Sequence, residues 1–506
     1  MDQTRQHVII FDDFSGGEYG DIAPEKAPPN SFTGTNMVVY DDGTIGPRAG
    51  LQQFAFTGVE ADPVLGVVWR GTAPDLAAFI NDAVFRYDTL TEGAESTFTG
   101  FLTGAPTQPV QGFEYGNSQV YVTVYGDQSY VLDFVAGTVT ALTSSPGGTD
   151  TCLYGERMIV VGDDAQPQRL YYSAALDFND WPAANFIDVG NASGALVGCW
   201  AQRGHLVILT QNGEWWVLTG VPGTGTLRRV SGGGVHPWNA YTDAWELLGS
   251  DVILGVPISA DYPSTFNGAT VVDYRSLRIN DTAPQTGANT IKVIHGFRPD
   301  EAIIIFPGTA GNNRVALYQN GVWTFHTFNV TISEYAISDR QGRVFFTDGG
   351  AAATAANWYQ WYLPLDRPAF ISDTYATVGD DSDSTPVEAE VTFPEKWAPE
   401  GREWRVRQVV VDFTKYDIEA APDNEFQVEV TSLGRYADDG TSAVTKTWTE
   451  SGLQASGTGV RDRQVFNFGA DVRYGGGFQL RLHSVIGVKF RTITVVLEDR
   501  KHVPRF

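Results

Sequence analysis

Cysteine, methionine and histidine are scarce: the 506 residues include 2 Cys, 3 Met and 7 His. Two isolated cysteines, Cys152 and Cys199, make neither a disulfide framework nor a four-ligand zinc site, and we interpret them as small buried hydrophobic residues. No two histidines are spaced at i, i+2 or i, i+4, so the sequence contains no local metal-binding pair, although distant repeats could still assemble a site.

Long apolar runs are also missing. The N-terminal segment has only one short run, Val8 to Phe11, and no cleavage-site pattern, so it does not look like a signal peptide. No stretch approaches the ~20 apolar residues that would span a bilayer. We therefore expect a protein without a membrane span that is made in the cytoplasm and not exported by an N-terminal signal.

Positive charge is in short supply. The chain has 34 Lys+Arg against 60 Asp+Glu, a formal net charge of −26. Affinity for phosphates comes mainly from cationic side chains, so this balance argues against tight DNA or RNA binding. High acidity favours solubility, and it would also let nucleic acid pass a surface without adhering to it.

Motifs of the common catalytic classes are absent. There is no G-x-S-x-G nucleophile elbow and no phosphate-binding loop ending in Lys-Ser/Thr, and residues 231–234 (SGGG) are interpreted as a turn. The calcium-like spacing at Asp381 and Asp383 lacks the required glycine, because Pro386 stands there. We expect no catalytic, cofactor-binding or metal-binding residue.

Paired carboxylates and aromatic clusters leave one chemical alternative. Glycosidases use converging carboxylates, and aromatic rings stack on sugars. Most of the Asp-Asp pairs precede glycine or lie in turns, where Asp caps its own backbone, and the aromatic clusters suit blade packing, so we favour the structural interpretation. The pairs begin at Asp12, Asp41, Asp163, Asp380 and Asp438, and the clusters are 215–216 and 358–362.

An internal repeat is the most informative feature. From residue 64 onward, a short apolar strand, a Gly or Asp turn, a strong apolar strand, another turn and an aromatic-bearing strand recur about every 40–49 residues. The seven units start at Val64–Gly71, Val110–Asn117, Asp150–Arg157, Ala195–Gly204, Ala240–Gly249, Asn289–Phe297 and Ile332–Gly342. In the fifth unit the third strand is predicted at 269–274 (ATVVDY).

This period is typical of a four-stranded propeller blade of ~40–50 residues. We predict an all-β protein with a β-propeller of about seven blades over residues 61–370; six or eight blades, or unrelated hairpins of two β-sandwiches, are the alternatives. Residues 1–60 are expected to form an extended arm and a strand pair that closes the ring by completing the last blade.

The repeat fades after Leu363, and residues 371–390 are polar, which indicates a boundary. Beyond it, alternating apolar segments predict strands at 403–413, 425–434, 463–469, 478–485 and 489–499. We therefore expect residues 371–506 to form a C-terminal β-sandwich domain.

Two segments resemble a known family. Phe14–Gly17 followed by Ile22–Gly50 is similar to the opening of many tailed-bacteriophage virion proteins, and Arg169–Gly190 resembles a segment of phage tail β-propeller proteins. The matching positions are Pro28, Pro29, Asn30, Asn36, Val39, Gly43, Ile45, Arg48 and Gly50 in the first, and Trp181, Pro182, Asn185, Asp188, Val189 and Gly190 in the second. Gly, Pro and Asn set turns and Trp packs, so these motifs predict architecture rather than chemistry.

The resemblance implies a structural virion protein of a phage tail, nearest to the tail nozzle or tail-tube protein of short-tailed phages. Such a protein forms a homo-oligomeric ring, six copies by analogy, that continues the DNA-ejection channel. It contacts a portal or adaptor ring and tail fibre or tail-tip proteins. DNA passes through without specific binding, and the protein is assembled in the host cytoplasm.

Other functions remain as alternatives. Some relatives are distal tail or tail-tip proteins instead. A carbohydrate-binding or carbohydrate-degrading propeller at the tail tip would need carboxylates and aromatic rings that converge at one mouth of the propeller. A cellular propeller scaffold is disfavoured by the phage-like N-terminal segment.

Overall fold

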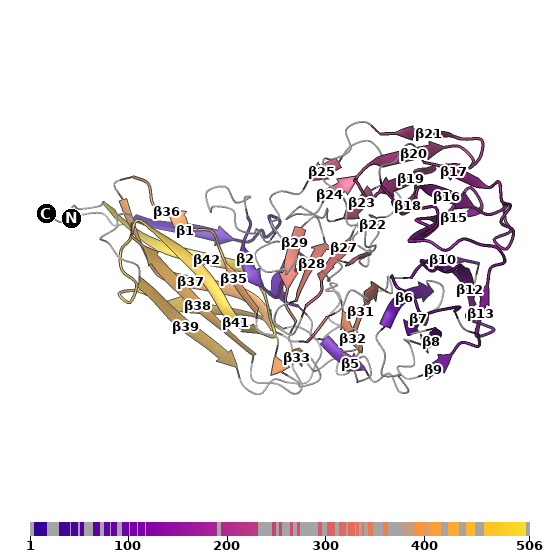
Figure 1. The fold of residues 1–506 in the computed structure, drawn as a ribbon. Helices are drawn as coiled ribbons and strands as arrows, with labels where there is room; N and C mark the ends of the chain where they lie inside the picture. The colour runs from indigo at the N-terminus through magenta and orange to yellow at the C-terminus, as the bar shows by residue number, and fades with distance from the viewer. Residues whose placement is uncertain are drawn as a thin grey trace. The chain divides into compact units, whose positions relative to one another are not determined.

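Strands make up nearly all of the regular structure in the computed structural model (Figure 1), and no helix occurs in the part of the chain that it describes. The structure describes residues 5–501 except for 18–29, 55–63, 231–244, 256–263, 274–291, 348–357, 363–378, 416–423, 435–441, 451–459 and shorter stretches of one to five residues. The chain divides into two units: Met1–Gln52, Ala316–Thr327 and Tyr362–Phe506 form one, and Gln53–Val315 and Phe328–Trp361 the other.

The protein is all-β, with a β-propeller and a β-sandwich. Among the described residues, seven four-stranded antiparallel sheets form the propeller, one for each predicted repeat. We number these blades 1 to 7 in the order of their first strands. Blades 1 to 3 contain β6 (Val64–Arg70), β7 (Asp75–Ile80), β8 (Ala83–Asp88) and β9 (Ala94–Thr97); β10 (Gln111–Tyr115), β11 (Gln119–Thr123), β12 (Ser129–Asp133) and β13 (Thr138–Ala141); and β14 (Asp150–Tyr154), β15 (Arg157–Val161), β16 (Arg169–Tyr172) and β17 (Phe186–Asp188).

The remaining blades follow the same strand order. They contain β18 (Leu196–Gln202), β19 (His205–Thr210), β20 (Trp215–Thr219) and β21 (Thr226–Arg229); β22 (Trp245–Leu248), β23 (Val252–Gly255), β24 (Ser264–Phe266) and β25 (Val271–Asp273); β26 (Lys292–His295), β27 (Ala302–Phe306), β28 (Arg314–Gln319) and β29 (Val322–His326); and β30 (Ala336–Ser338), β31 (Arg343–Thr347), β32 (Trp358–Tyr362) and β5 (Leu51–Phe54).

The first strands of the blades lie next to one another around the ring. β6 contacts β10, β10 contacts β14, β14 contacts β18, β22 contacts β26, and β26 contacts β30. The contact of β30 with β6 brings the last blade back to the first, so the arrangement is circular.

Burial follows the position of a strand within its blade. The second strands β19 and β27 are buried along almost their whole length, because neighbouring blades cover both faces. Among the fourth strands, β21 is mostly exposed and β13 partly exposed, whereas β29 of blade 6 is buried along its whole length. Burial on both faces explains why the second strands are continuous apolar runs.

The prediction for the fifth repeat was wrong in one detail. The segment predicted as its third strand contains β25, which is the fourth strand of blade 5. The third strand is β24, whose sequence STF is short and has no apolar run, so the periodic pattern could not show it.

Two six-stranded sheets form the sandwich. One has the order β3 (Met37–Val39), β4 (Ile45–Pro47), β42 (Val488–Lys501), β37 (Arg402–Lys415) and β40 (Val460–Asn467), with β1 (Arg5–Phe11) also paired to β42. The other has the order β2 (Thr33–Thr35), β35 (Ala389–Thr392), β41 (Gly477–Ile486), β38 (Asn424–Leu433) and β39 (Ser442–Glu450), with β36 (Lys396–Trp397) paired to β41. A further pair, β33 (Gly379–Asp380) and β34 (Thr385–Pro386), lies in the predicted boundary segment.

Alternate residues of the sandwich strands meet in one hydrophobic core. Phe413, Phe426 and Phe490 are fully buried, and Phe426 packs edge to face against Phe413 at 5.1 Å and against Phe490 at 5.2 Å. Because both sheets contribute one face, the strands alternate as the sequence predicts.

The N-terminal segment differs from the expected arm. Of its strands, β1 to β4 belong to the sandwich sheets, and only β5 completes a propeller blade. The pairing of β1 with β42 joins residues at opposite ends of the chain, for which no local sequence pattern exists.

One end of this sheet is held by a buried carboxylate. Asp499 on β42 is only 1% exposed, the Arg402 Nε–H donates to it at 2.7 Å, and His7 Nε2 lies 3.0 Å away. Burial disfavours ionisation of Asp499, but the hydrogen bonds from Arg402 and His7 outweigh it and lower the pKa of this carboxyl below its ordinary value.

We expect Asp499→Asn to lower the free energy of unfolding by about 1–3 kcal/mol at pH 7, because charge-assisted hydrogen bonds are lost. A lowered folded-state pKa stabilises the protein above the unfolded-state pKa, and this stabilisation is lost as the pH falls through the folded-state value. Urea unfolding at neutral and strongly acidic pH should therefore show a difference that shrinks in acid. Asp462→Asn, which removes an exposed partner of Lys415, is the control and should cost less than about 1 kcal/mol. A constant loss at every pH for Asp499→Asn would contradict this explanation.

Candidate functional site

Among the described residues, no group of three or more His, Cys, Asp or Glu side chains is placed so that it could hold a metal ion. Within the same residues, no helix is long and apolar enough to cross a membrane. The calcium-like spacing lies outside the described residues, since 381–384 are among those left out.

Three of the five Asp-Asp pairs have a member that caps a turn. Asp13 accepts a hydrogen bond from the Ser15 N–H at 2.9 Å, and Asp42 accepts one from the Thr44 N–H at 3.0 Å. Asp163 accepts one from the Gln166 N–H at 3.0 Å, and its burial raises the pKa of this carboxyl. The turn interpretation is confirmed for these three aspartates, whereas Asp41, Asp381, Asp438 and Asp439 lie outside the described residues.

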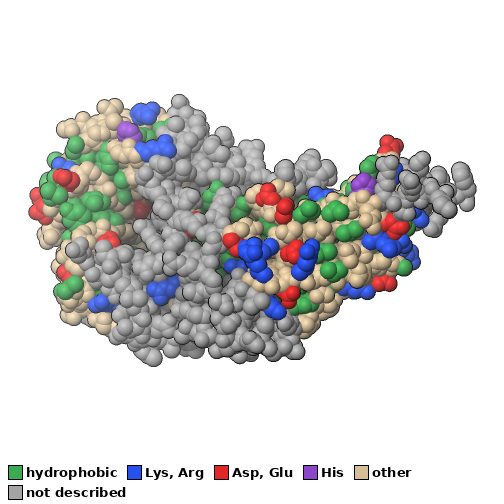
Figure 2. Space-filling view, turned by 180° about the vertical axis from the view of Figure 1, so that it is seen from behind, with side chains coloured by type: hydrophobic (Ala, Val, Ile, Leu, Met, Phe, Trp, Pro, Cys, Tyr) green, Lys and Arg blue, Asp and Glu red, His purple; other side chains and the backbone are tan. Residues whose placement is uncertain are grey.

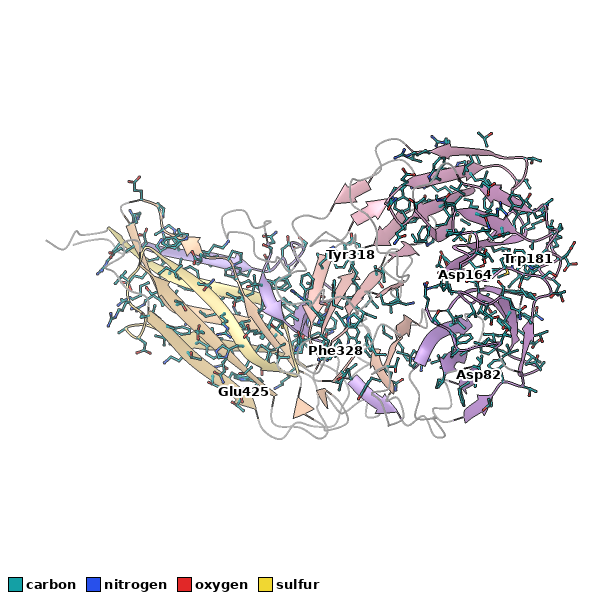
Figure 3. All side chains as sticks on the ribbon, in the orientation of Figure 1. Asp82, Asp164, Trp181, Tyr318, Phe328 and Glu425 are labelled. Atoms are coloured by element: carbon teal, nitrogen blue, oxygen red, sulfur yellow. The ribbon has the colours of Figure 1, made fainter. Side chains whose placement is uncertain are left out.

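The aromatic clusters and the cysteines belong largely to the blade interior. Trp215 and Trp361 are fully buried, and Trp361 packs edge to face against Phe328 (Figure 3) at 5.4 Å. Cys199 on β18 is also buried, and its N–H donates to Asp150 on β14 at 2.7 Å. Cys152 lies on that same neighbouring first strand and is half-buried.

Two family-like residues of the N-terminal segment are brought together in a buried cluster. Arg48 is 1% exposed; its Nε–H donates to Asn36 Oδ1 at 3.1 Å and its Nη2–H donates to the Thr327 carbonyl at 3.0 Å. The same Asn36 oxygen accepts the Thr327 N–H at 3.0 Å. Arg48 therefore holds the strand pair β3–β4 and residue 327 together inside one unit.

Backbone conformation explains three residues of this segment, including Asn36 of the cluster. Asn30, Asn36 and Gly43 have φ angles of 61°, 58° and 76°. Only Gly, and to a lesser degree Asn, adopts this left-handed region without strain, so the residue types match the turns. Pro28, Pro29 and Gly50 lie outside the described residues.

The second family-like segment contains β16, β17 and the long turn between them. The Trp181 Nε1–H (Figure 3) donates to the Phe178 carbonyl at 2.7 Å, and the Asn185 N–H donates to the Pro182 carbonyl at 2.8 Å. Asp188 forms an ion pair of 2.9 Å with Arg169 at the base of the turn. These residues fold the turn itself and belong to the propeller unit, apart from the Arg48 cluster; Gly190 lies outside the described residues.

Sequence reasoning missed a set of exposed hydrophobic residues in the propeller. Val135, Leu176 and Val221 are between 51% and 78% exposed. Each lies in the turn between the third and fourth strands of blades 2, 3 and 4, so the three occupy equivalent positions on one face of consecutive blades. We call these three residues the turn surface. The available signal was an apolar residue within an otherwise Gly- and Asp-rich turn.

Each of these turns is anchored to the preceding blade. Arg86 of blade 1 donates to the Phe134 carbonyl at 2.8 Å, and Tyr154 of blade 3 donates to the Gly220 carbonyl at 2.9 Å. Phe178 packs against Tyr115 and Tyr121 of blade 2, each at 4.8 Å. The turns are thereby held by side chains of their neighbours.

Leu176 has an unusual backbone. Its φ is 59°, a region that a bulky residue occupies only under strain. Its N–H donates to the Glu156 carbonyl at 2.7 Å, and the side chain is 62% exposed. The turn thus keeps a large apolar side chain in solvent at a conformational cost.

Charge is divided unevenly along the chain. Residues 385–506 contain 16 Lys+Arg and 18 Asp+Glu, which leaves 18 and 42 for residues 1–384, a net charge of −24 there. On the face that Figure 2 shows, Lys and Arg side chains gather over the sandwich, with Asp and Glu side chains among them. Almost all of the excess acidity therefore belongs to residues outside the C-terminal segment.

We expect Arg48→Ala to lower the free energy of unfolding by about 3–5 kcal/mol, because it leaves buried acceptors without their donor. Arg48→Lys should recover only part of this loss, since an ammonium group cannot reproduce the forked geometry. Denaturant unfolding of the full chain measures both effects. Full rescue by lysine would show that charge alone, and not the paired hydrogen bonds, matters at this position.

Similarity to known proteins is found among solved structures and not among family models or curated proteins. No protein-family model matches the chain, and no curated protein matches it. Solved structures with similar folds include a computationally designed protein, Ika8 (10% identity, TM-score 0.39, covering 62% of this chain and 100% of that one). The Swd1 (Cps50) β-propeller domain of Myceliophteria thermophila matches at 9% identity and TM-score 0.44, covering 62% and 99%. PorZ of Porphyromonas gingivalis, a component of the type-IX secretion system, matches at 10% identity and a TM-score of 0.39. This match covers 68% of the present chain and 43% of the length of PorZ.

Proposed function

We propose that this protein is a structural component of a bacteriophage tail, of the nozzle or tail-tube type, in which several copies form a ring that continues the DNA-ejection channel. It has no catalytic role in this proposal. Its partners are further copies of itself, a portal or adaptor ring and tail fibre or tail-tip proteins.

The observation that carries the proposal is the role of the family-like residues. Arg48 and Asn36 form a buried hydrogen-bonded cluster, and Trp181 and Asn185 fold the turn between β16 and β17. Residues that resemble those of phage tail proteins therefore act as framework in this chain. A shared framework supports a shared architecture, and function then depends on interfaces and surface charge.

The charge distribution supports a conduit for DNA. Residues 1–384 carry a net charge of −24, and a carboxylate-rich wall repels phosphates and keeps a passing duplex from adhering. The proposal requires that some of these carboxylates line the channel of the assembled ring.

Immunogold electron microscopy tests the location. An antibody raised against residues 385–506 is applied to particles from a lysate carrying this gene. Gold at the tail is expected, and its position along the tail distinguishes a nozzle from a tip protein. Intact tailed particles without label, with the denatured protein detected only in the soluble fraction, would overturn the proposal.

A second test concerns the paired carboxylates. Asp163 caps a turn through the Gln166 N–H, so we expect the double substitution Asp163→Ala and Asp164→Ala to leave particle infectivity within about threefold of the unmodified phage, since a lost cap costs about 1 kcal/mol. Plaque counts at equal particle number measure this. A large loss of infectivity with normal assembly, together with sugar release from host surface polysaccharide by the unmodified protein, would favour a carbohydrate-degrading propeller instead.

A further inference from the structure

The outer face of one sandwich sheet carries a row of apolar side chains. Val8, Ile10 and Val465 are 55%, 54% and 40% exposed. The register places Ile10 opposite Thr494, Thr494 opposite Val410, and Val410 opposite Val465, and it places Val8 opposite Val496. We call Val8, Ile10, Val410, Val465 and Val496 the apolar row, of which Val410 is only 7% exposed. The intervening residues Val409, Val411 and Val495 point to the core instead.

The strand at one end of this row has an open edge. β1 pairs with β42 on one side, and no described strand pairs with its other side. Exposed edge strands are usually protected by charged residues. β40, at the other edge of this sheet, has Arg461, Asp462 and Arg463, whereas residues 8–11 of β1 are Val-Ile-Ile-Phe. A strand edge of this kind is suited to contact with another chain.

Positive charge flanks the apolar row. Five arginines share this face according to the strand register or to their ion pairs, against three acids: Arg405, Arg407, Arg461, Arg463 and Arg500 against Glu403, Asp412 and Glu498. Glu498 accepts a hydrogen bond from Arg405 and forms an ion pair of 3.3 Å with Arg407, and Asp412 forms one of 3.3 Å with Arg463. The face therefore has more arginines than carboxylates.

The turn surface has the opposite charge. The segments 133–137, 173–186 and 220–225, which contain Val135, Leu176 and Val221, include Asp133, Asp177 and Asp180 and no Lys or Arg. Asp177 and Asp180 are exposed beside Leu176. Each chain thus has an apolar surface on the propeller with aspartates beside two of its three turns, and an apolar surface on the sandwich with a cationic border.

We propose that the turn surface of one copy docks on the apolar row of a second copy. The inference deepens the proposed ring, on which it rests, by naming the two surfaces in contact. The contact is heterologous, since it joins two different surfaces of identical chains, and repetition of such a contact produces a ring or an open filament. Apolar contact supplies the affinity and opposite charge sets the orientation. Because neighbouring blades already hold these turns in place, the turns lose little conformational entropy when two copies associate.

Complementation between two variants tests the contact with purified full-length protein. The first variant combines Leu176→Asp and Val221→Asp; the second combines Ile10→Asp and Val465→Asp. Sedimentation velocity should show concentration-dependent assembly of the unmodified chain and a loss of at least about tenfold in association constant for each variant alone. An equimolar mixture should form dimers and stop there, because only one intact pair of surfaces remains.

Matched variants separate association from folding. Trp397 is also 48% exposed but lies on β36, in the other sandwich sheet, so Trp397→Ser should assemble like the unmodified chain. Leu176→Asn should keep or raise the thermal midpoint, because Asn tolerates the left-handed backbone, yet weaken association. Higher salt should weaken assembly of the unmodified chain.

These sedimentation results test the inferred contact independently of the immunogold experiment on phage particles. A monomeric unmodified chain, unchanged assembly of both double variants, or a mixture that stays monomeric would each overturn the inference. The last result, with both variants folded, would show that the turn surface and the apolar row do not bind each other, whereas assembly of one variant by itself would indicate a contact between like surfaces. If gold labelling failed to locate the protein on tails, the proposed virion role would be wrong. The sedimentation measurement would still test the contact between copies.

Discussion

The pairing of β5 with β32 is the constraint on which the propeller depends. Blade 7 has only three strands from its own repeat, and residues 51–54 supply the fourth. A blade has apolar side chains on both faces, so each needs a neighbour, and the ring must close for blades 1 and 7 to have one. The contact of β30 with β6 provides that closure. The chain segment before residue 53 is therefore required by both units, since β1 to β4 also complete the sandwich sheets.

The strand framework of each unit also determines which apolar side chains reach the surface. In the propeller, side chains such as Arg86, Tyr154 and Tyr115 hold the turns of the next blade, and these turns present Val135, Leu176 and Val221. In the sandwich, the same alternation that buries Val409 and Val411 leaves Ile10 and Val465 exposed. Neither surface needs a catalytic group, and both follow from strand geometry that the core already determines.

The sequence predicted what is local and periodic. Seven apolar repeats indicated about seven blades, and Asp-Asp pairs indicated turns. The Asn and Gly residues of the N-terminal segment also indicated turns, and the structure has left-handed backbone at Asn36 and Gly43. It could not predict long-range pairing, such as β1 with β42, because no local pattern encodes a partner nearly 490 residues away. It also missed β24, which is too short and polar for a periodic signal, and Leu176, whose exposure depends on a backbone conformation that bulky residues rarely adopt.

Quantitative mass spectrometry of gradient-purified particles tests the central claim, that this chain is a structural part of the virion, most directly. Particles are prepared from a lysate carrying the gene, and peptides of this chain are counted against those of the portal protein. Our account predicts several copies per particle, in a fixed ratio to the portal that does not change with repeated purification. Absence of the chain from particles that retain their tails and infectivity would contradict it.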